Sequence, residues 1–267
     1  MGPIIVSGLP RSGTTWMQWF LSQHPRIHIH GQEPRGLNND KQIVGMSWNI
    51  LLDFYEKMID GSQWAEQSNA TPELRNYQIP HYAGTSSLNC KKIFAKMTED
   101  FLCGFAPRKP RWGVKSLFLN CKQKSIDTIN SIWQDTKWII CTRDPFVSFE
   151  SQRNTFVENQ DLNDWVQQWI ACVKNIKKNQ FYHVQIDKLG ENSMDRQRTL
   201  RRALVYVEEE STKETEDFIE KFPIIHKVKP DKLREYKLPP KDRTEMLNKY
   251  GDLGSLMQEI GYEVNNG

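Results

Sequence analysis

The chain has 267 residues, of which 38% are hydrophobic and 26% charged, and its formal net charge is +3. This composition excludes a disordered chain, and the length is sufficient for one α/β domain with a buried core. The lysines and arginines are scattered and form no stripe. We therefore expect an anionic ligand but no nucleic-acid partner.

The cysteines and the apolar runs indicate the cellular compartment of the protein. Five cysteines form no CxxC pair and are odd in number, which predicts reduced thiols in a cytoplasmic protein. The first apolar run, Ile4–Val6, is too short for a signal peptide or a membrane anchor. No other stretch approaches the roughly 18 apolar residues of a membrane span, so we expect no membrane attachment.

The first elements in chain order are a strand, a loop and a helix. Pro3–Ser7 is a short β-branched run, and a loop rich in glycine, proline and serine follows it. Trp16, Trp19 and Phe20 then recur at helical spacing, and His24-Pro25 ends the predicted helix. The protein therefore begins with a strand–loop–helix unit.

Strand and helix patterns alternate along the rest of the chain. Strands are predicted at Arg111–Leu119, Lys137–Thr142 and Phe181–Ile186. Helices are predicted at Val44–Ile59, Leu88–Phe105, Ser125–Trp133, from Phe146 onward, Leu162–Lys178, Thr199–Val207, Thr215–Phe222 and Glu245–Ile260. Such alternation implies crossover connections and parallel strands. We predict an α/β fold, with one parallel β-sheet flanked by helices in a single domain spanning residues 1–267.

The loop after the first strand has the frame of a phosphate-binding loop. Gly8 and Gly13 match the glycines of GxxxxGK[ST], which let successive backbone N–H groups point at an anion. Ser12, Thr14 and Thr15 add hydroxyl groups, and the helix adds its N-terminal dipole. Thr14 replaces the lysine that reaches the phosphates of a nucleoside triphosphate, which disfavours ATP hydrolysis. The alternative is that the glycines only turn the chain.

The same loop, Pro10–Trp16 (PRSGTTW), resembles the 5′-phosphosulfate loop of the sulfotransferase family. That family moves a sulfuryl group from 3′-phosphoadenosine 5′-phosphosulfate (PAPS) to a hydroxyl or an amine and releases adenosine 3′,5′-bisphosphate. The resemblance implies that Arg11 replaces the missing lysine and that residues 12–15 (Ser12, Gly13, Thr14 and Thr15) hold the phosphosulfate. It places Trp16 beside the nucleotide, although the ring could equally belong to the core.

A second motif supports this resemblance. The family has a strand ending in Arg, then [ND]-P, with a serine eight residues after the arginine, and together they bind the 3′-phosphate. Here Arg143 precedes Asp144-Pro145, and Ser151 stands at that spacing. A guanidinium binds phosphate in a bidentate manner. Ser148, one helical turn earlier, is the alternative hydroxyl.

The general base resembles that of the protein-tyrosine sulfotransferase branch. The cytosolic small-molecule branch uses a histidine two residues after a lysine, but Leu117 stands at that place after Lys115. The tyrosine branch has a G-E-E-T-R stretch, and GQEPR, residues 31–35, is similar to it with one residue inserted. The resemblance implies that Glu33 is the base and that Lys115 is the catalytic lysine.

Three histidines are rival bases: His24, His28 and His30. His24 before Pro25 is expected to end a helix, whereas His28 and His30 share one face if their segment is extended. Two histidines could meet a metal ion, but no third ligand stands near them in the sequence, so we expect no metal.

The late part of the chain resembles the family less closely. IIHKVKPDKLREYKLPP has the lysine-rich, proline-punctuated character of the family's loop over the cofactor, and Lys229 before Pro230 matches best. Lys227 and Lys237 compete with it. Ile186-Asp187 stands where the family has Tyr-Glu after a strand.

Together these motifs predict a PAPS-dependent sulfotransferase that uses Glu33 as base and no metal. The acceptor is expected to be a hydroxyl of a small molecule, a glycan or a peptide, and residues 37–110 are expected to cap its cleft. Two alternatives stay open: a P-loop nucleotide kinase that uses ATP and Mg²⁺, and a non-catalytic nucleotide-binding protein.

Overall fold

A computed structural model describes residues 2–31, 87–104, 109–155, 160–191, 193–221 and 236–264. Within these ranges one sheet holds five strands in the order β2-β3-β1-β4-β5, and every neighbouring pair is parallel. The strands are β1 (Ile4–Gly8), β2 (Ile27–His30), β3 (Arg111–Leu117), β4 (Lys137–Thr142) and β5 (Tyr182–Gln185). The predicted parallel α/β fold is confirmed.

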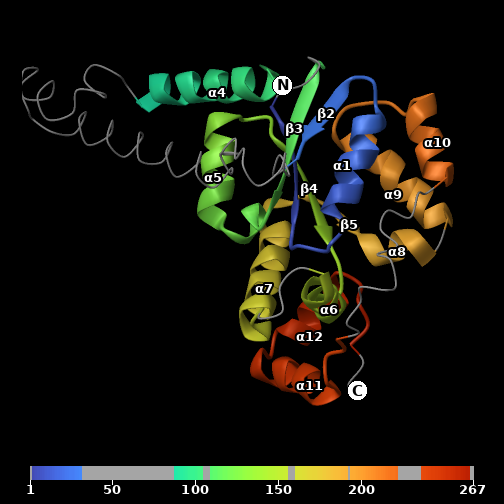
Figure 1. Cartoon of the computed structure of the whole chain (residues 1–267). Helices are drawn as coiled ribbons and strands as arrows, with labels where there is room; N and C mark the ends of the chain where they lie inside the picture. Colours follow the sequence, from blue (N-terminus) through green and yellow to red (C-terminus); the bar gives the residue numbers. More distant parts are fainter. Residues whose placement is uncertain are drawn as a thin grey trace, which may run out of the picture.

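Helices cover both faces of this sheet (Figure 1). On one side lie α1 (Thr14–Gln23), α9 (Ser193–Tyr206) and α10 (Lys213–Lys221), and on the other lie α4 (Ser87–Gly104), α5 (Gln123–Ile132) and α7 (Leu162–Asn179). The remaining helices are α6 (Pro145–Thr155), α8 (Ile186–Glu191), α11 (Pro240–Lys249) and α12 (Leu253–Glu259), with a 3₁₀ turn at Leu119–Cys121.

The core consists of two clusters, one on each face of the sheet. Side chains alternate along β1, so Ile4 and Val6 pack with α1 and α9, whereas Ile5 packs with α5 and α7. All three side chains are fully buried. A central parallel strand that is covered on both faces carries consecutive apolar residues, and the short run Ile4–Val6 therefore predicted this strand.

Three local features differ from the sequence prediction. β2 and α8 were not predicted as elements. The prediction of a single helix at Glu245–Ile260 is wrong, because α11 ends at Lys249 and α12 begins at Leu253, with a turn between them. The Leu253 amide closes this turn on the Tyr250 carbonyl at 2.8 Å, and Gly251 within it disfavours a continuous helix. The predicted helix Val44–Ile59 lies outside the described residues.

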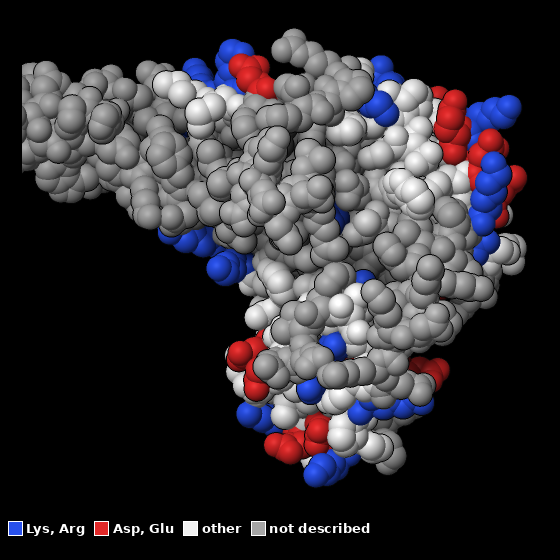
Figure 2. Space-filling view, in the orientation of Figure 1, with Lys and Arg blue, Asp and Glu red and all other residues white. Residues whose placement is uncertain are grey.

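The described surface mixes both signs of charge. In Figure 2 blue and red side chains alternate along the edge formed by α9 and α10. There Arg201 pairs with Glu216 and Arg198 with Asp195. Such a mixed surface differs from the continuous basic stripe typical of nucleic-acid-binding proteins.

Candidate active site

The loop between β1 and α1 depends on two glycines with positive φ. Gly13, the N-cap of α1, has φ 82°, and a Cβ there would lie 2.3 Å from Cγ1 of Ile186. Gly8 has φ 153°, and a Cβ there would lie 2.2 Å from the carbonyl oxygen of Cys141. Ser12 Oγ donates a hydrogen bond to the Leu9 carbonyl at 2.6 Å and closes the loop. The glycines are therefore needed for close packing as well as for the turn.

The start of α1 suits an anion. The first backbone N–H groups of a helix have no partner within the helix, and the N-cap Gly13 has no side chain that could accept from them. The helix dipole adds positive potential at this end. The chemistry of this donor set, with the hydroxyl of exposed Thr15 beside it, fits a phosphate-like group.

Two basic side chains lie at this loop. Arg11 has φ 65°, a conformation that is uncommon for a residue with a side chain. Its Nε donates to Ser151 Oγ on α6 at 2.9 Å. Lys115 Nζ donates to Thr15 Oγ1 at 3.3 Å. The structure thus brings residues of the two predicted anion motifs into direct contact, although 140 positions separate them in the sequence.

The order of the strands in the sheet explains why the two anion motifs lie next to each other. β1 lies between β3 and β4, with Gly8 opposite Leu117 on one side and Cys141 on the other. Arg143 follows directly after β4, and Lys115 lies near the end of β3. Both predicted cations therefore lie at the carboxyl edge of the sheet, where ligands bind in open α/β folds.

The turn that carries Arg143 is held by two tryptophans of α7. Trp169 Nε1 donates to the Arg143 carbonyl at 3.0 Å, and Trp165 Nε1 donates to the Pro145 carbonyl at 2.9 Å. The side chain of Arg143 is bound separately, because its Nε donates to Asp187 Oδ1 at 3.0 Å. Both the backbone and the side chain of this arginine are therefore fixed.

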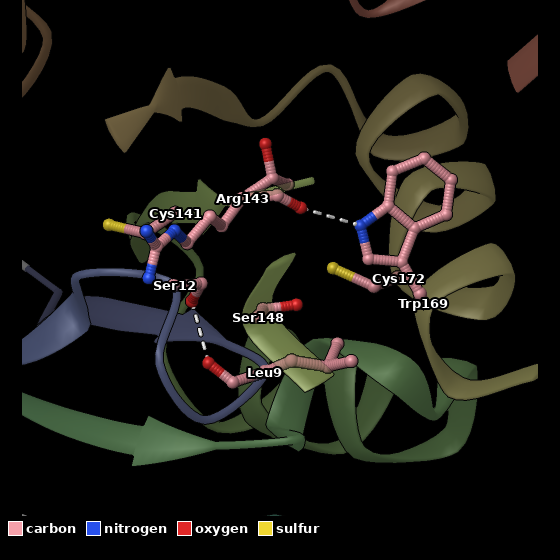
Figure 3. Close-up of a pocket in the computed structure, with 8 residues that line it drawn as sticks. Leu9, Ser12, Cys141, Arg143, Ser148, Trp169 and Cys172 are labelled. Atoms are coloured by element: carbon pink, nitrogen blue, oxygen red, sulfur yellow. Dashed lines mark hydrogen bonds between the residues drawn. The ribbon is translucent and has the colours of Figure 1, made fainter. Parts of the chain in front are cut away.

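Of the two candidate serines, Ser151 is the better placed for an anion. Ser148 is 1% exposed, and its hydroxyl donates to the Pro145 carbonyl at 3.0 Å. Its side chain faces a narrow pocket that extends beneath the first loop to Arg143 (Figure 3). The pocket is lined by Leu9, Ser12, Cys141, Thr142, Arg143, Ser148, Trp169 and Cys172. Residues of both anion loops therefore line the same pocket.

We expect Trp169→Phe to lower the free energy of unfolding by about 1–3 kcal/mol, because the Arg143 carbonyl would lose its buried donor. Trp169 is 1% exposed. Urea denaturation would measure the change. Trp19→Phe is the matched control, since Trp19 is 49% exposed and its loss should cost less than about 0.5 kcal/mol. Equal effects of the two substitutions would contradict the expectation.

The three histidines differ in their environment. His24 is 2% exposed, its Nδ1 accepts from the Arg26 amide, and its Nε2 lies 3.1 Å from the Glu210 carbonyl. These contacts give it a structural role at the end of α1. His28 and His30 share one face of β2, as predicted, with ring centroids 4.5 Å apart. Burial and the neighbouring His28 lower the pKa of His30 to about 4, so it is neutral at pH 7.

A polar contact that the sequence did not indicate lies behind Arg143. Thr142 Oγ1 is 2.7 Å from His183 Nε2 and 3.0 Å from the Tyr262 hydroxyl. Burial, with a smaller effect of Lys188, lowers the pKa of His183 to about 4. The network joins the last residue of β4 and the second residue of β5 to the C-terminal segment.

This histidine makes stability depend on pH. The folded pKa of His183 lies below the unfolded value, so the unfolded state binds more protons as the pH falls from about 6.5 to 4. We expect His183 to account for about 2 kcal/mol of lost unfolding free energy between pH 7.5 and pH 5. Urea denaturation at both values should show a smaller loss for His183→Gln. An unchanged loss would contradict the assignment.

The remaining predicted residues fall in different places. The indole of Trp16 stacks on Phe20 and contacts Phe218 of α10, with centroids 6.1 and 5.2 Å apart. Lys237 is exposed and precedes α11. Glu33, Lys227 and Lys229 lie outside the described residues. Within the described ranges no group of three or more His, Cys, Asp or Glu residues could hold a metal ion.

Comparison with known proteins decides the family. Residues 3–205, which include both loops, match the model of the sulfotransferase family. This chain belongs to the sulfotransferase family. The predicted recognition of the family is therefore confirmed. No helix in the part of the chain that the structure describes is long and apolar enough to cross a membrane.

Individual sulfotransferases agree with this assignment. Protein-tyrosine sulfotransferase A of Caenorhabditis elegans is 24% identical over 176 residues, which are 64% of this chain and 39% of that protein. The chain thus spans about two fifths of this relative. The sulfotransferase domain of the Synechococcus PCC 7002 olefin synthase superposes with a TM-score of 0.53 at 13% identity, covering 99% and 96% of the two chains. Sulfotransferase STF9 from Mycobacterium avium gives 0.51 at 17%, covering 98% and 77%; these two likenesses concern the fold.

Proposed function

We propose that this sulfotransferase uses PAPS as donor and transfers its sulfuryl group in line to an acceptor hydroxyl. The contact between Arg11 and Ser151 carries the proposal, because it joins the two loops that would hold the two anionic groups of one nucleotide. The first loop, residues 11–15, would hold the 5′-phosphosulfate. Arg143 and Ser151 would hold the 3′-phosphate, which distinguishes PAPS from ATP.

When bound, PAPS supplies the activated sulfuryl group. The acceptor oxygen forms a bond to sulfur while the bond from sulfur to the leaving phosphate breaks, so negative charge grows on that phosphate. Arg11 and Lys115 would stabilise this charge from the two sides of the loop. These side chains would provide the neutralisation that Mg²⁺ provides in kinases, so no metal is required.

The proton of the acceptor would pass to Glu33, and Lys229 would cover the nucleotide. Both assignments depend on the resemblance of GQEPR and of the late lysine-rich stretch to the family. We further propose that residues 1–267 form a single domain in which residues 37–110 cap the acceptor cleft. The similarity to a protein-tyrosine sulfotransferase makes a peptide tyrosine one of the acceptors to test, beside small phenols and glycans.

Calorimetric titration tests the donor. Adenosine 3′,5′-bisphosphate should bind much more tightly than ATP, with or without Mg²⁺, and labelled PAPS should then transfer label to an acceptor without added metal. Preference for ATP with Mg²⁺ would favour the P-loop kinase instead. Tight bisphosphate binding without turnover on any acceptor class would favour a non-catalytic nucleotide-binding protein.

A further inference from the structure

The dipeptide Ile186-Asp187, where β5 ends and α8 begins, contacts both anion loops. Ile186 packs so closely on Gly13 that a Cβ at that glycine would lie within 2.9 Å of three of its side-chain carbons. Asp187 accepts from Arg143 Nε at 3.0 Å and from the Asp144 amide at 3.2 Å. One short segment therefore sets how the first loop and the second loop lie relative to each other.

The carboxylate of Asp187 fixes the direction of the Arg143 side chain. Its two oxygens bind two donors of the same turn, so the carboxylate itself cannot rotate without losing one of them. Arginine has five N–H donors, and Asp187 takes the one on Nε. Among the described residues, Nη1 and Nη2 of Arg143 have no hydrogen-bond partner, and the side chain is 29% exposed. The outer edge of the guanidinium is thus presented outward.

Other contacts hold the backbone of this turn and leave the side chain to Asp187. Asp144 Oδ1 accepts from the Phe146 and Val147 amides at 2.9 and 3.0 Å and so caps α6. Trp169 binds the Arg143 carbonyl. Within the described chain, Asp187 is the ion-pair partner that orients the guanidinium.

We propose that Asp187 is a positioning residue that aims Arg143 at the 3′-phosphate and so makes the site select 3′-phosphorylated nucleotides. This inference rests on the proposed function. A carboxylate beside a phosphate site has two opposed effects. Its charge repels the phosphate, whereas its hydrogen bond holds the arginine in the geometry that bidentate binding needs. Removal of the Asp187 carboxylate should strengthen phosphate binding if repulsion dominates and weaken it if positioning dominates, so the sign of the change distinguishes the two roles.

Asp187→Asn tests the sign, because it removes the charge and one of the two acceptors with little change of shape. We expect the Kd for adenosine 3′,5′-bisphosphate to rise about tenfold, as for loss of a charged hydrogen bond, and the Kd for 5′-AMP to change less than about twofold. Asp252→Asn is the matched control, since Asp252 forms an ion pair with Lys174 outside the site. Tighter or unchanged bisphosphate binding in Asp187→Asn would overturn the proposal.

A double-mutant cycle separates positioning from a general structural effect. In an Arg143→Ala background, Asp187→Asn should leave the Kd for the bisphosphate unchanged, because no guanidinium remains to be positioned. A loss of the same size in both backgrounds would overturn the proposal. If the wild-type protein does not prefer the bisphosphate to 5′-AMP, the proposed function itself fails. If that preference survives intact in Asp187→Asn, only the inference about Asp187 fails.

Discussion

Arg143→Ala is expected to weaken the binding of adenosine 3′,5′-bisphosphate about a hundredfold and to change the affinity for 5′-AMP little. At the lower end of the usual range, two charge-assisted hydrogen bonds from one guanidinium to a phosphate contribute about 1.5 kcal/mol each, and their sum of about 3 kcal/mol corresponds to roughly this factor. The side chain lies at the carboxyl edge of the sheet, held by Asp187. Since 5′-AMP has no 3′-phosphate, it should not sense the loss.

Calorimetric titration with the two nucleotides measures this selectivity directly. Arg153→Ala is the matched control, because Arg153 is on α6, the helix that follows the Arg143 turn, and its guanidinium stacks over Tyr236 at 4.1 Å from the ring centroid. It should leave the ratio of the two Kd values unchanged. If Arg143→Ala weakens both nucleotides equally, the assignment of Arg143 to the 3′-phosphate is refuted.

Short-range patterns were sufficient to predict most of the fold. β1 and β4 each contain an unbroken apolar run, Ile4–Val6 and Trp138–Cys141, because helices cover both faces of the sheet. Amphipathic α7 showed its buried face through Trp165 and Trp169. β2 escaped prediction because Ile27–His30 has only four residues and half of its side chains are histidines. Gly251 marks the break between α11 and α12, but a glycine is also tolerated within a helix.

The site was predictable only as far as its local motifs extend. Arg11 and Arg143 were predicted from the resemblance of their loops to motifs of the sulfotransferase family, and each of these loops follows a strand. The residues that hold them come from distant positions: Asp187 lies 44 residues from Arg143, and Trp169 lies 26 residues from it. Such partners carry no local signal, and Trp169 is recognisable from the sequence only as part of a buried helix face.

Strand order connects the fold with the proposed chemistry. The first loop is at the end of β1, and the chain reaches β4 only after β2 and β3 have been placed on the other side of β1. This arrangement puts the cations of β3 and of the turn after β4 on opposite flanks of one loop. A nucleotide with two anionic groups could therefore be bound by side chains that lie far apart in the sequence, and Ile186-Asp187, directly after β5, would set their spacing.

Glu33→Gln is expected to lower kcat about a hundred- to ten-thousandfold, the range for loss of a general base. The affinity for adenosine 3′,5′-bisphosphate should be unchanged, because the anion loops do not include Glu33. Steady-state kinetics with labelled PAPS, together with calorimetric titration of the bisphosphate, would measure both quantities. A parallel loss of affinity and turnover would contradict a role confined to proton transfer.

His30 is the rival base that the structure allows to be tested against Glu33. It is at the carboxyl end of β2, and it is neutral at pH 7, so it could accept a proton. Its pKa of about 4, however, makes it a weak base, and general-base catalysis is most effective when the pKa lies near the working pH. We therefore expect His30→Asn to lower kcat less than about tenfold. If His30→Asn abolishes turnover while Glu33→Gln retains it, His30 is the general base. The resemblance of GQEPR to the protein-tyrosine sulfotransferase branch would then not identify the base.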